Sequence, residues 1–580
     1  MRQLCFVLLF FSGGALRAQV EQLATSGDGH TLLFHTRFRL QSETELGSTG
    51  KIYRFQDGQI TRVAVAPDIG FAISPTDYFG PFLSTDGSVV GWQINIGCGL
   101  CQIIVAPPLS SQISGVSFPA GFPRGTVRMS PNGRYFTADD YPFRGPQYLD
   151  ASTGAVADIP VDLFARPIVR EVADNGTTLL LITPSQDPVQ YTAPDTLSLW
   201  KPGADPQPVY SENRVFGPTI SGNGARIAFE SVVDGGPNDD QRTLLVMDTQ
   251  TLQQIQVASM PSKDYRALFD SFSHPRWDQS GTKLIYRTFD DQPQPVAISL
   301  WDAGTQTSSV ILNNSEGFAD AVISGDGSTV WAGTNNNRLL QLNLATGATD
   351  EILPPLGSIG NGADTTGIAG SALFLQGAGF TTSQTVLDGS VQLPIVAVEP
   401  QGLWVQIPWE YAPARQENHK LLIRSQDNPF EALASITVSP GIQPYLPRWI
   451  DPATLGQYAK AVHQDFQSLV TPANPTHPGE VVHVYLTGLG PLDHPLPTGA
   501  PGPLDPLSHP VTPLSCSLGG NPLIPMEILD VTYAVGLVGI YQADIRIPDT
   551  IPSGSPTLFC SSPATPGFNT TAHISITPAQ

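Results

Sequence analysis

Short apolar runs of strand-like length follow one another along the chain, separated by turns rich in Gly, Asn and Asp. Examples are residues 31–34, 226–229 and 283–286. Runs of this length between turn residues are typical of β-strands, and alternating apolar residues between 395 and 442 indicate half-buried antiparallel strands. The pattern therefore predicts an all-β protein made of many short strands.

A four-residue pattern recurs seven times before the strand-like runs. It consists of a small or acidic residue, a spacer, then Asp, Asn or Ser, then Gly, at residues 26–29, 84–87, 130–133, 173–176, 221–224, 278–281 and 324–327. The closing glycines are 58, 46, 43, 48, 57 and 46 residues apart, which is close to the length of one four-stranded propeller blade. Asp-Gly and Asn-Gly close tight hairpins, so we predict a β-propeller over residues 19–355, with seven blades by this count and six or eight if the repeat boundaries differ.

The repeat resembles the TolB-type, WD-like propeller repeat over about residues 20–355. Its best example is Ser130-Pro131-Asn132-Gly133 followed by an aromatic strand. The resemblance implies that these turns join the first and second strands on one face. It also implies that the loops after the second strands surround a central funnel on the opposite face. It implies a fold and no particular activity.

The predicted funnel loops carry acidic clusters that are candidate ligand-binding residues. These residues are Asp139, Asp140, Asp234, Asp239, Asp240, Asp290 and Asp291. An acidic mouth can hold a divalent cation, such as a structural calcium ion, or a basic segment. Solvated loop charge is the alternative, and no cluster has EF-hand spacing. No other cofactor is expected.

The repeat stops near residue 355, and two further strand-rich modules follow at residues 365–444 and 445–580. The second contains a Pro-Gly-Glu strand ending in Thr-Gly-Leu-Gly-Pro at 478–491, and Gly-Ile-Tyr-Gln at 539–542 in a strand that ends at Pro548. These strings resemble an uncharacterised C-terminal domain family of exported acidobacterial proteins, over about residues 365–578. Residues 401–404 depart from its Gln-Ile-Asn-type sequence. The resemblance implies two immunoglobulin-like sandwiches with no assigned activity.

Residues 1–18 have the positive start, apolar stretch and small residues of a signal peptide. We therefore expect an exported, periplasmic or extracellular protein without a transmembrane segment. The cysteines agree with export. Apart from Cys5, three pairings of Cys98, Cys101, Cys516 and Cys560 are possible, and chain order favours Cys98–Cys101 and Cys516–Cys560.

The formal net charge of −22 excludes nucleic acid as a partner. It leaves cations, basic proteins and neutral glycans as candidate ligands, and we expect a monomer. Gly-x-Ser-x-Gly and His-Glu-x-x-His motifs are absent. The sequence therefore favours a non-enzymatic binding or scaffold protein, with the sandwiches as spacer or attachment modules.

Two other functions stay open. One is a glycoside hydrolase or lyase that uses funnel carboxylates, and the other is a periplasmic partner of an envelope complex. Trp404 and Trp409 are either sugar platforms or packing residues.

Overall fold

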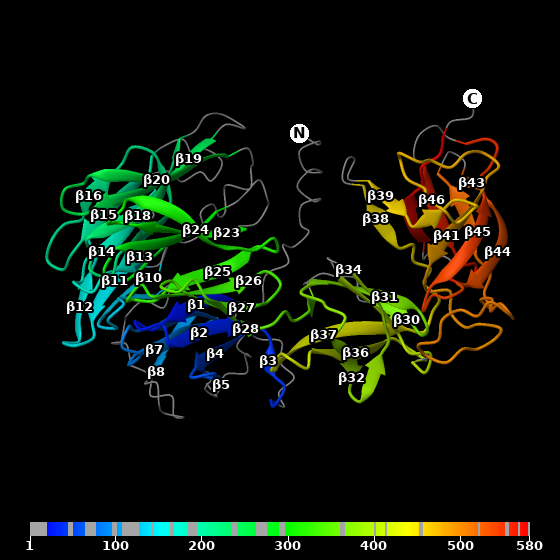
Figure 1. Cartoon of the computed structure of the whole chain (residues 1–580), viewed down its shortest axis with the longest axis horizontal. Coiled ribbons are helices and arrows are strands. Elements are labelled where there is room, and N and C mark those ends of the chain that lie inside the picture. Colours follow the sequence, from blue (N-terminus) through cyan, green and yellow to red (C-terminus); the bar gives the residue numbers. More distant parts are fainter. Residues whose placement is uncertain are drawn as a thin grey trace. The chain divides into compact units, whose positions relative to one another are not determined.

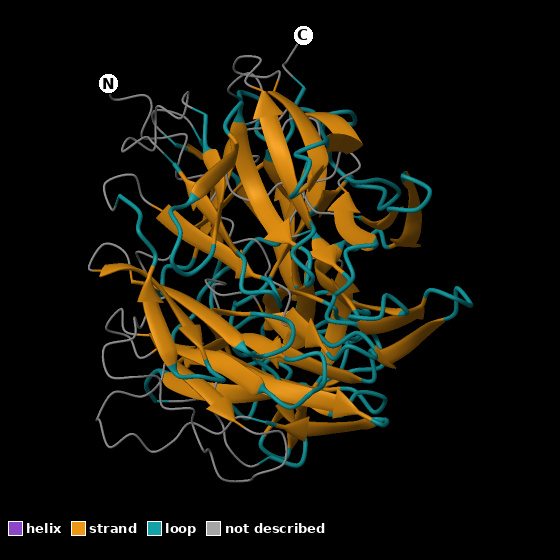
Figure 2. Ribbon diagram, turned by 90° about the vertical axis from the view of Figure 1, so that its left-hand side faces the viewer, coloured by secondary structure: helices purple, strands orange, loops and turns teal. Residues whose placement is uncertain are grey.

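The computed structural model contains only β-strands as regular elements in the residues it describes (Figures 1 and 2). Those residues are 20–43, 50–63, 77–95, 101–106, 127–140, 144–162, 167–183, 194–233, 240–262, 275–288, 296–359, 366–399, 402–411, 414–451, 456–519, 523–551, 556–565 and 569–577. Within them, no helix is long and apolar enough to cross a membrane. The all-β prediction is confirmed.

The chain divides into two compact units, residues 17–355 and residues 356–580. Each unit is described below by itself.

The first unit consists of consecutive antiparallel sheets, each formed by one continuous stretch of chain. Six sheets have four strands and one, β6-β7-β8, has three among the described residues. The strands of the first three sheets are β1 (Val20–Thr25), β2 (Thr31–Thr36), β4 (Lys51–Gln56), β5 (Gln59–Arg62); β6 (Asp77–Leu83), β7 (Val90–Asn95), β8 (Cys101–Ala106); and β9 (Val127–Met129), β10 (Tyr135–Asp140), β11 (Arg144–Asp150), β12 (Ala155–Asp158). A short strand, β3 (Arg39–Leu40), follows β2.

The remaining four sheets of this unit repeat the same order. Their strands are β13 (Pro167–Val172), β14 (Thr178–Ile182), β15 (Thr196–Trp200), β16 (Gln207–Tyr210); β17 (Arg214–Ile220), β18 (Arg226–Val233), β19 (Asp240–Asp248), β20 (Gln254–Ser262); β21 (Arg276–Trp277), β22 (Lys283–Thr288), β23 (Ala297–Asp302), β24 (Thr307–Asn313); and β25 (Phe318–Ile323), β26 (Thr329–Thr334), β27 (Leu339–Asn343), β28 (Thr349–Leu353). This succession of sheets is typical of propeller blades.

Burial falls from the second to the fourth strand of a sheet. All six residues of β26 are buried, whereas the first four residues of β24 are exposed. The apolar core lies between neighbouring sheets: one cluster joins Leu179 and Leu197 to Ile227 and Phe229 of the next sheet. Because each sheet buries both faces against its neighbours, its inner strands are apolar almost throughout.

The second unit contains two pairs of sheets. The first pair has strand orders β29-β31-β35-β34 and β37-β36-β32-β33, with β30 parallel to β37. These strands are β29 (Ser358–Ile359), β30 (Thr366–Ile368), β31 (Ala372–Ala378), β32 (Thr385–Asp388), β33 (Val391–Leu393), β34 (Ile395–Glu399), β35 (Gly402–Gln406), β36 (Glu417–Arg424) and β37 (Phe430–Ser439).

The second pair has strand orders β38-β39-β47-β46-β42-β43 and β40-β41-β45-β44. Its strands are β38 (Arg448–Ile450), β39 (Gln457–Ala459), β40 (Ala461–Val462), β41 (Val481–Leu486), β42 (Ser515–Leu518), β43 (Ile524–Pro525), β44 (Glu527–Tyr533), β45 (Tyr541–Arg546), β46 (Thr557–Ser561) and β47 (Asn569–His573). One core cluster takes residues from both sheets, so the two sheets pack face to face.

Cys516 and Cys560 lie opposite each other on β42 and β46 and form a disulfide inside this core. This predicted pairing is confirmed. Cys98 lies outside the described residues and the side chain of Cys101 is not described, so the other pairing stays a prediction.

Candidate functional site

The seven recurring turns each connect the first and second strands of a sheet, as the resemblance to the propeller repeat implies. In the first, Ser26 Oγ donates to Asp28 Oδ1 at 2.6 Å, and the backbone N–H of Thr31 donates to Ser26 Oγ at 3.0 Å. The Ser hydrogen bond holds the pKa of Asp28 below its usual value. Since the same Ser–Asp arrangement recurs at Ser84–Asp86, the recurring Ser and Asp residues of the repeat close its hairpins.

The turns also bind one another. Backbone hydrogen bonds of 2.7–2.9 Å run from Gly27 N to Thr85 O, Thr85 N to Pro131 O, Asp174 N to Gly222 O, Asn223 N to Gln279 O, Gln279 N to Gly325 O, and Asp326 N to Gly27 O. The remaining link is a bond from Asn132 N to Asp174 Oδ1 at 2.7 Å. Together these bonds form a closed ring, and we call the edge of the sheets that carries it the turn face.

Asp174 reaches further than the other turn residues. Its Oδ2 accepts a 2.8 Å hydrogen bond from Gln279 Nε2, two sheets further along the ring. A second link between the same two sheets is the 3.6 Å ion pair of Arg276 with Glu171. Burial raises the pKa of Asp174. These cross-links tie non-adjacent sheets together near the turn face.

The opposite edge of the sheets, where second strands lead into third strands, is the loop face. Asp139 and Asp140 end β10 and Asp240 begins β19, so all three lie at this edge; their side chains are not described. The remaining candidates, Asp234, Asp239, Asp290 and Asp291, lie outside the described residues. The predicted acidic funnel therefore stays a prediction.

Beneath the loop face lies a set of buried charged side chains that sequence reasoning missed. We call it the charged layer; it comprises His35, Arg39, Lys51, Asp195, Glu230, Arg242, Arg287 and Asp320, all less than 9% exposed. Glu230 and Arg242 form an ion pair of 3.0 Å with side chains 2% and 3% exposed. A single charged residue inside an apolar strand, such as Glu230 in β18, is the only signal the sequence offers for it.

Part of the charged layer fastens neighbouring sheets together. Asp320 Oδ2 accepts from the backbone N–H of Leu23 at 2.8 Å, which joins the last sheet to the first. Arg287 donates to the carbonyl of Phe318 at 2.9 Å. Asp195 accepts from Val215 N at 2.8 Å, and burial raises the pKa of this carboxyl. These groups can position the loop face because each spans two sheets.

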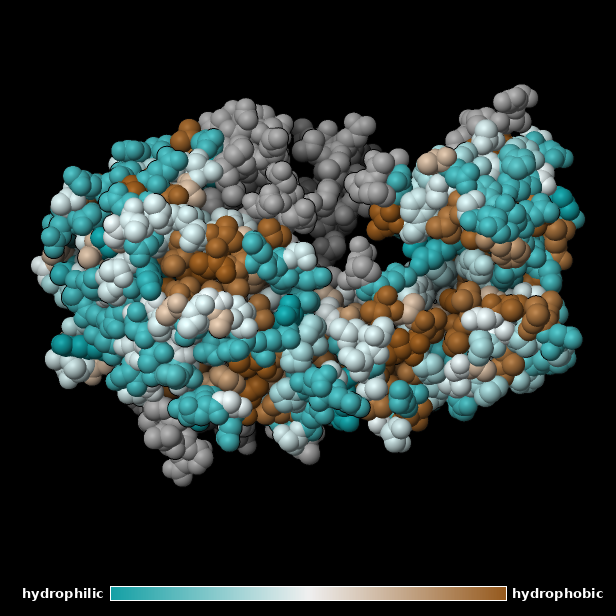
Figure 3. Space-filling model, viewed as in Figure 1, coloured by the Kyte–Doolittle hydropathy of each residue, from teal (hydrophilic) through white to brown (hydrophobic). Residues whose placement is uncertain are grey.

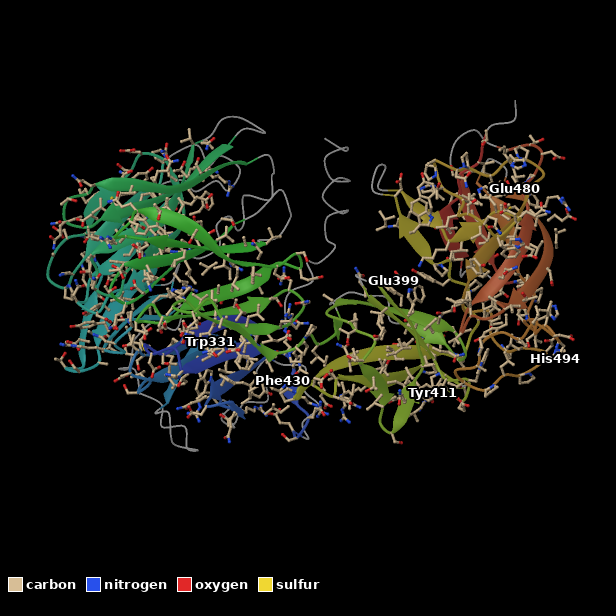
Figure 4. The ribbon with its side chains drawn as sticks, in the orientation of Figure 1. Trp331, Glu399, Tyr411, Phe430, Glu480 and His494 are labelled. Atoms are coloured by element: carbon tan, nitrogen blue, oxygen red, sulfur yellow. A yellow bond between two sulfur atoms is a disulfide. The ribbon has the colours of Figure 1, made fainter. Side chains whose placement is uncertain are left out.

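The ring also closes through a buried indole. Trp331 of β26, which Figure 4 labels, donates from Nε1 to Gly29 O at 3.1 Å. The last sheet, β25-β26-β27-β28, thus contacts the first sheet, β1-β2-β4-β5, through side chains. Neither sheet contains a strand from the other end of the unit.

Trp404 of β35 and Trp409, which follows β35, pack against neighbouring residues and do not form a sugar platform. Trp404 is 7% exposed, and its Nε1 donates to Glu399 at 3.1 Å. Lys460 lies over the Trp404 ring and bonds Glu399 at 2.8 Å. Trp409 packs against the core of the second sandwich. Both residues serve packing.

The motifs quoted for the C-terminal resemblance meet at one place. Thr487 Oγ1 donates to Gly539 O at 2.8 Å and accepts from Ala372 N at 2.9 Å. Gln406 Nε2 donates to Tyr533 Oη at 3.2 Å. These residues join strands 366–439 to strands 448–573, so the motifs explain an internal interface.

No metal centre is visible in the described part of the chain, where no group of three or more His, Cys, Asp or Glu side chains is arranged to hold an ion. The expected calcium site would need residues outside that part and is untested.

No protein-family model matches the chain. A comparison with curated proteins finds no match either. Among solved structures the chain is similar to an oligogalacturonate lyase in complex with manganese, at 15% identity over 55% of this chain and 87% of that one, with a TM-score of 0.40.

The chain is also similar to TolB from Acinetobacter baumannii, at 13% identity over 62% of this chain and 79% of that one, with a TM-score of 0.27. A third similar structure is the β-propeller domain of the trilobed protease from Pyrococcus furiosus, at 11% identity over 58% and 95%, with a TM-score of 0.39. At these identities the likeness concerns the propeller fold alone.

Proposed function

We propose that the chain is an exported, non-enzymatic binding or scaffold protein. In this proposal residues 19–355 form a seven-bladed propeller whose loop face recognises a protein or glycan partner. Two immunoglobulin-like sandwiches act as spacer or attachment modules. The protein works as a monomer in the periplasm or outside the cell.

The difference between the two faces of the propeller carries this proposal. On the turn face, the backbone groups and the Ser, Asp and Asn side chains bond to one another in a ring. A surface whose polar groups are already paired gains little from a new partner. The loop-face edge of the sheets instead lies over a layer of fixed charges, and a connection such as residues 37–50 is longer in sequence than the four-residue turns. Rigid scaffolds with variable loops are the usual arrangement of binding surfaces.

The disulfide of the second sandwich supports export, because structural disulfides form in oxidising compartments.

The test compares matched carboxylate substitutions on the two faces. The mature chain from Gln19 onward is screened by thermal unfolding against calcium, polysaccharides and envelope proteins fractionated to single components. The double variant Asp239→Asn/Asp240→Asn removes loop-face charge, and Asp28→Asn/Asp86→Asn is the turn-face control. We expect the loop-face variant to weaken a stabilising ligand at least fivefold and the control to leave it within twofold.

Two outcomes would contradict the proposal. One is equal binding by the loop-face variant and the wild type. The other is release of oligosaccharide products by the wild type and its loss in the loop-face variant, which would identify a glycoside hydrolase or lyase.

A further inference from the structure

The six-stranded sheet of the second sandwich has one face in the core and one face outside it. Core residues on neighbouring strands include Leu558 and Cys560 of β46 and Cys516 and Leu518 of β42. Since side chains alternate along a strand, the residues between them point away from the core. The burial patterns of β46 (iBiBi in chain order, buried at Leu558 and Cys560) and β42 follow this alternation.

Aromatic and hydroxyl side chains fill this outer face. One row crosses four strands through the pairs Trp449 with Tyr458, Tyr458 with His573, and His573 with Thr557. A second row pairs Thr571 with Phe559, and Phe559 with Ser517. The rings in the first row touch: Trp449 stacks on Tyr458 at 5.2 Å and 25°, and Tyr458 lies 5.8 Å from His573. Of the strands that carry these rows, β38, β39 and β46 are labelled in Figure 1.

The outer face carries no Asp, Glu, Lys or Arg among these described positions, in a chain of net charge −22. The other sheet of the same sandwich is different. There the residues that alternate with the core include His483, Asp544 and Arg546, and Arg546 pairs with Glu527 at 2.8 Å. Lack of charge is therefore a property of one face and not of the module.

This face also differs from a plain apolar patch. Figure 3 shows hydrophobic residues gathered on the surface of the C-terminal unit, and its most exposed aliphatic side chains include Leu504 at 77% and Val511 at 63%. The six-stranded sheet instead combines rings with Ser and Thr hydroxyls, which both donate and accept hydrogen bonds. Aromatic rings offer an apolar face to C–H groups, and hydroxyls match the hydroxyls of a sugar.

Two nitrogens in the aromatic row lack a hydrogen-bond partner within the described structure. They are Trp449 Nε1 and His573 Nδ1, and both are shielded from solvent. A shielded polar atom without a partner costs about 1–3 kcal/mol. Because both atoms are shielded, they indicate a closely packed aromatic row, and a ligand on this face contacts the rings and the hydroxyl groups instead.

We propose that the outer face of β38-β39-β47-β46-β42-β43 binds a neutral polysaccharide chain. Stacking on Trp449 and Phe559 supplies the apolar contact, and Ser517, Thr557 and Thr571 supply hydrogen bonds. Charge decides the class of glycan: the face has no cation for a uronate or sulfate, and the acidic chain repels polyanions. The site lies on the second sandwich and does not depend on the propeller acting as a recognition surface.

Affinity electrophoresis of the full mature chain tests the site. Gels contain hydroxyethylcellulose, mixed-linkage β-glucan, xyloglucan or galactomannan, with polygalacturonate as the charged comparison. We expect retardation by at least one neutral polymer and none by polygalacturonate. Trp449→Ala and Phe559→Ala should each weaken binding at least tenfold. Phe466→Ala removes an aromatic side chain that is 54% exposed and stacks on His483 away from this face, and it should change binding less than twofold.

Ser517→Asp and Thr571→Asp keep the test decisive if an alanine variant fails to fold. Each places a carboxylate on the outer face without opening the core, and each should weaken binding tenfold while the unfolding temperature stays near that of the wild type. The proposal is overturned if no neutral polymer retards the wild type, or if the aspartate variants bind as the wild type does. The loop-face variant Asp239→Asn/Asp240→Asn, run on the same gels, distinguishes this site from a site on the propeller. It should bind the neutral polysaccharide as tightly as the wild type does.

Discussion

At the scale of single residues, the third position of the repeated turn shows why Asn and Asp are not equivalent. Asn223 uses Oδ1 to accept from Ser221 Oγ and Ala225 N, as Asp residues do in other turns. Its Nδ2 additionally donates to Ser280 O, in the next turn, at 2.5 Å. A carboxylate cannot make that bond.

We therefore expect Asn223→Asp to lower the free energy of unfolding by about 1–3 kcal/mol, because a donor is lost and a carboxylate faces a carbonyl. Denaturant unfolding measures the change. The control is Asp86→Asn, in which the acceptor for Ser84 is kept, and it should change stability by less than about 1 kcal/mol. Equal effects would show that the ring does not distinguish the two side chains.

The environment of Glu480, which Figure 4 labels, leads us to expect that the stability of the second sandwich depends on pH. Burial raises its pKa, but hydrogen bonds from Thr476 and His463, at 2.7 Å each, outweigh burial and hold the pKa below its usual value. A lowered carboxyl pKa stabilises the folded state above the unfolded pKa, and this contribution disappears as the pH falls through the folded pKa. Glu480→Gln should therefore reduce the loss of stability between pH 6 and pH 3, measured by urea unfolding at both pH values. An unchanged loss would contradict this assignment.

Local chemistry is what the sequence predicted well at this scale. The turns around Asp28 and Asp86 depend on residues two to five positions apart, so their hydrogen bonds follow from spacing alone. The pair Glu230–Arg242 depends on two strands lying in register. Spacing alone does not show that pairing, so the charged layer was missed.

At the scale of elements, Gly488 of the C-terminal motif is explained by close approach between two segments. Gly488 has a φ of +82°, and a Cβ there would lie 1.9 Å from Gln443 O. Gly536 has a similar φ of +76° but open space around the Cβ position. The sequence showed the Thr-Gly-Leu-Gly-Pro string without showing that it lies against another segment.

Alanine substitutions at Gly536 and Gly488 distinguish the cost of backbone strain from the cost of a steric clash. Gly536→Ala should cost only the strain of a positive φ, about 1–2 kcal/mol. Gly488→Ala adds a clash with backbone and should cost at least about 3 kcal/mol more, or prevent folding of the C-terminal unit. Thermal unfolding of both variants checks the difference, and similar losses would show that Gly488 is not in tight contact.

At the scale of the whole molecule, the two compact units predict independent stability. The disulfide Cys516–Cys560 closes a 44-residue separation inside the second sandwich. A crosslink of that length contributes about 3–4 kcal/mol. Its position followed from the count and order of the cysteines, whereas the division near residue 355 followed from where the repeat ends.

In Cys516→Ser/Cys560→Ser, calorimetry should show that the transition of the C-terminal unit falls in temperature while the propeller transition stays within 1–2 °C. Limited proteolysis after each transition assigns them. A shift of both transitions would mean that the two units unfold as one.

The central claim, that the loop face of the propeller is the recognition surface, is tested most directly by hydrogen–deuterium exchange with and without a stabilising partner. The claim predicts slower exchange in peptides that cover residues 36–50, 139–147 and 231–241. Peptides that cover the turns at 84–87 and 221–224 should be unchanged. Protection gained at the turns, with none at the loop-face peptides, would contradict it.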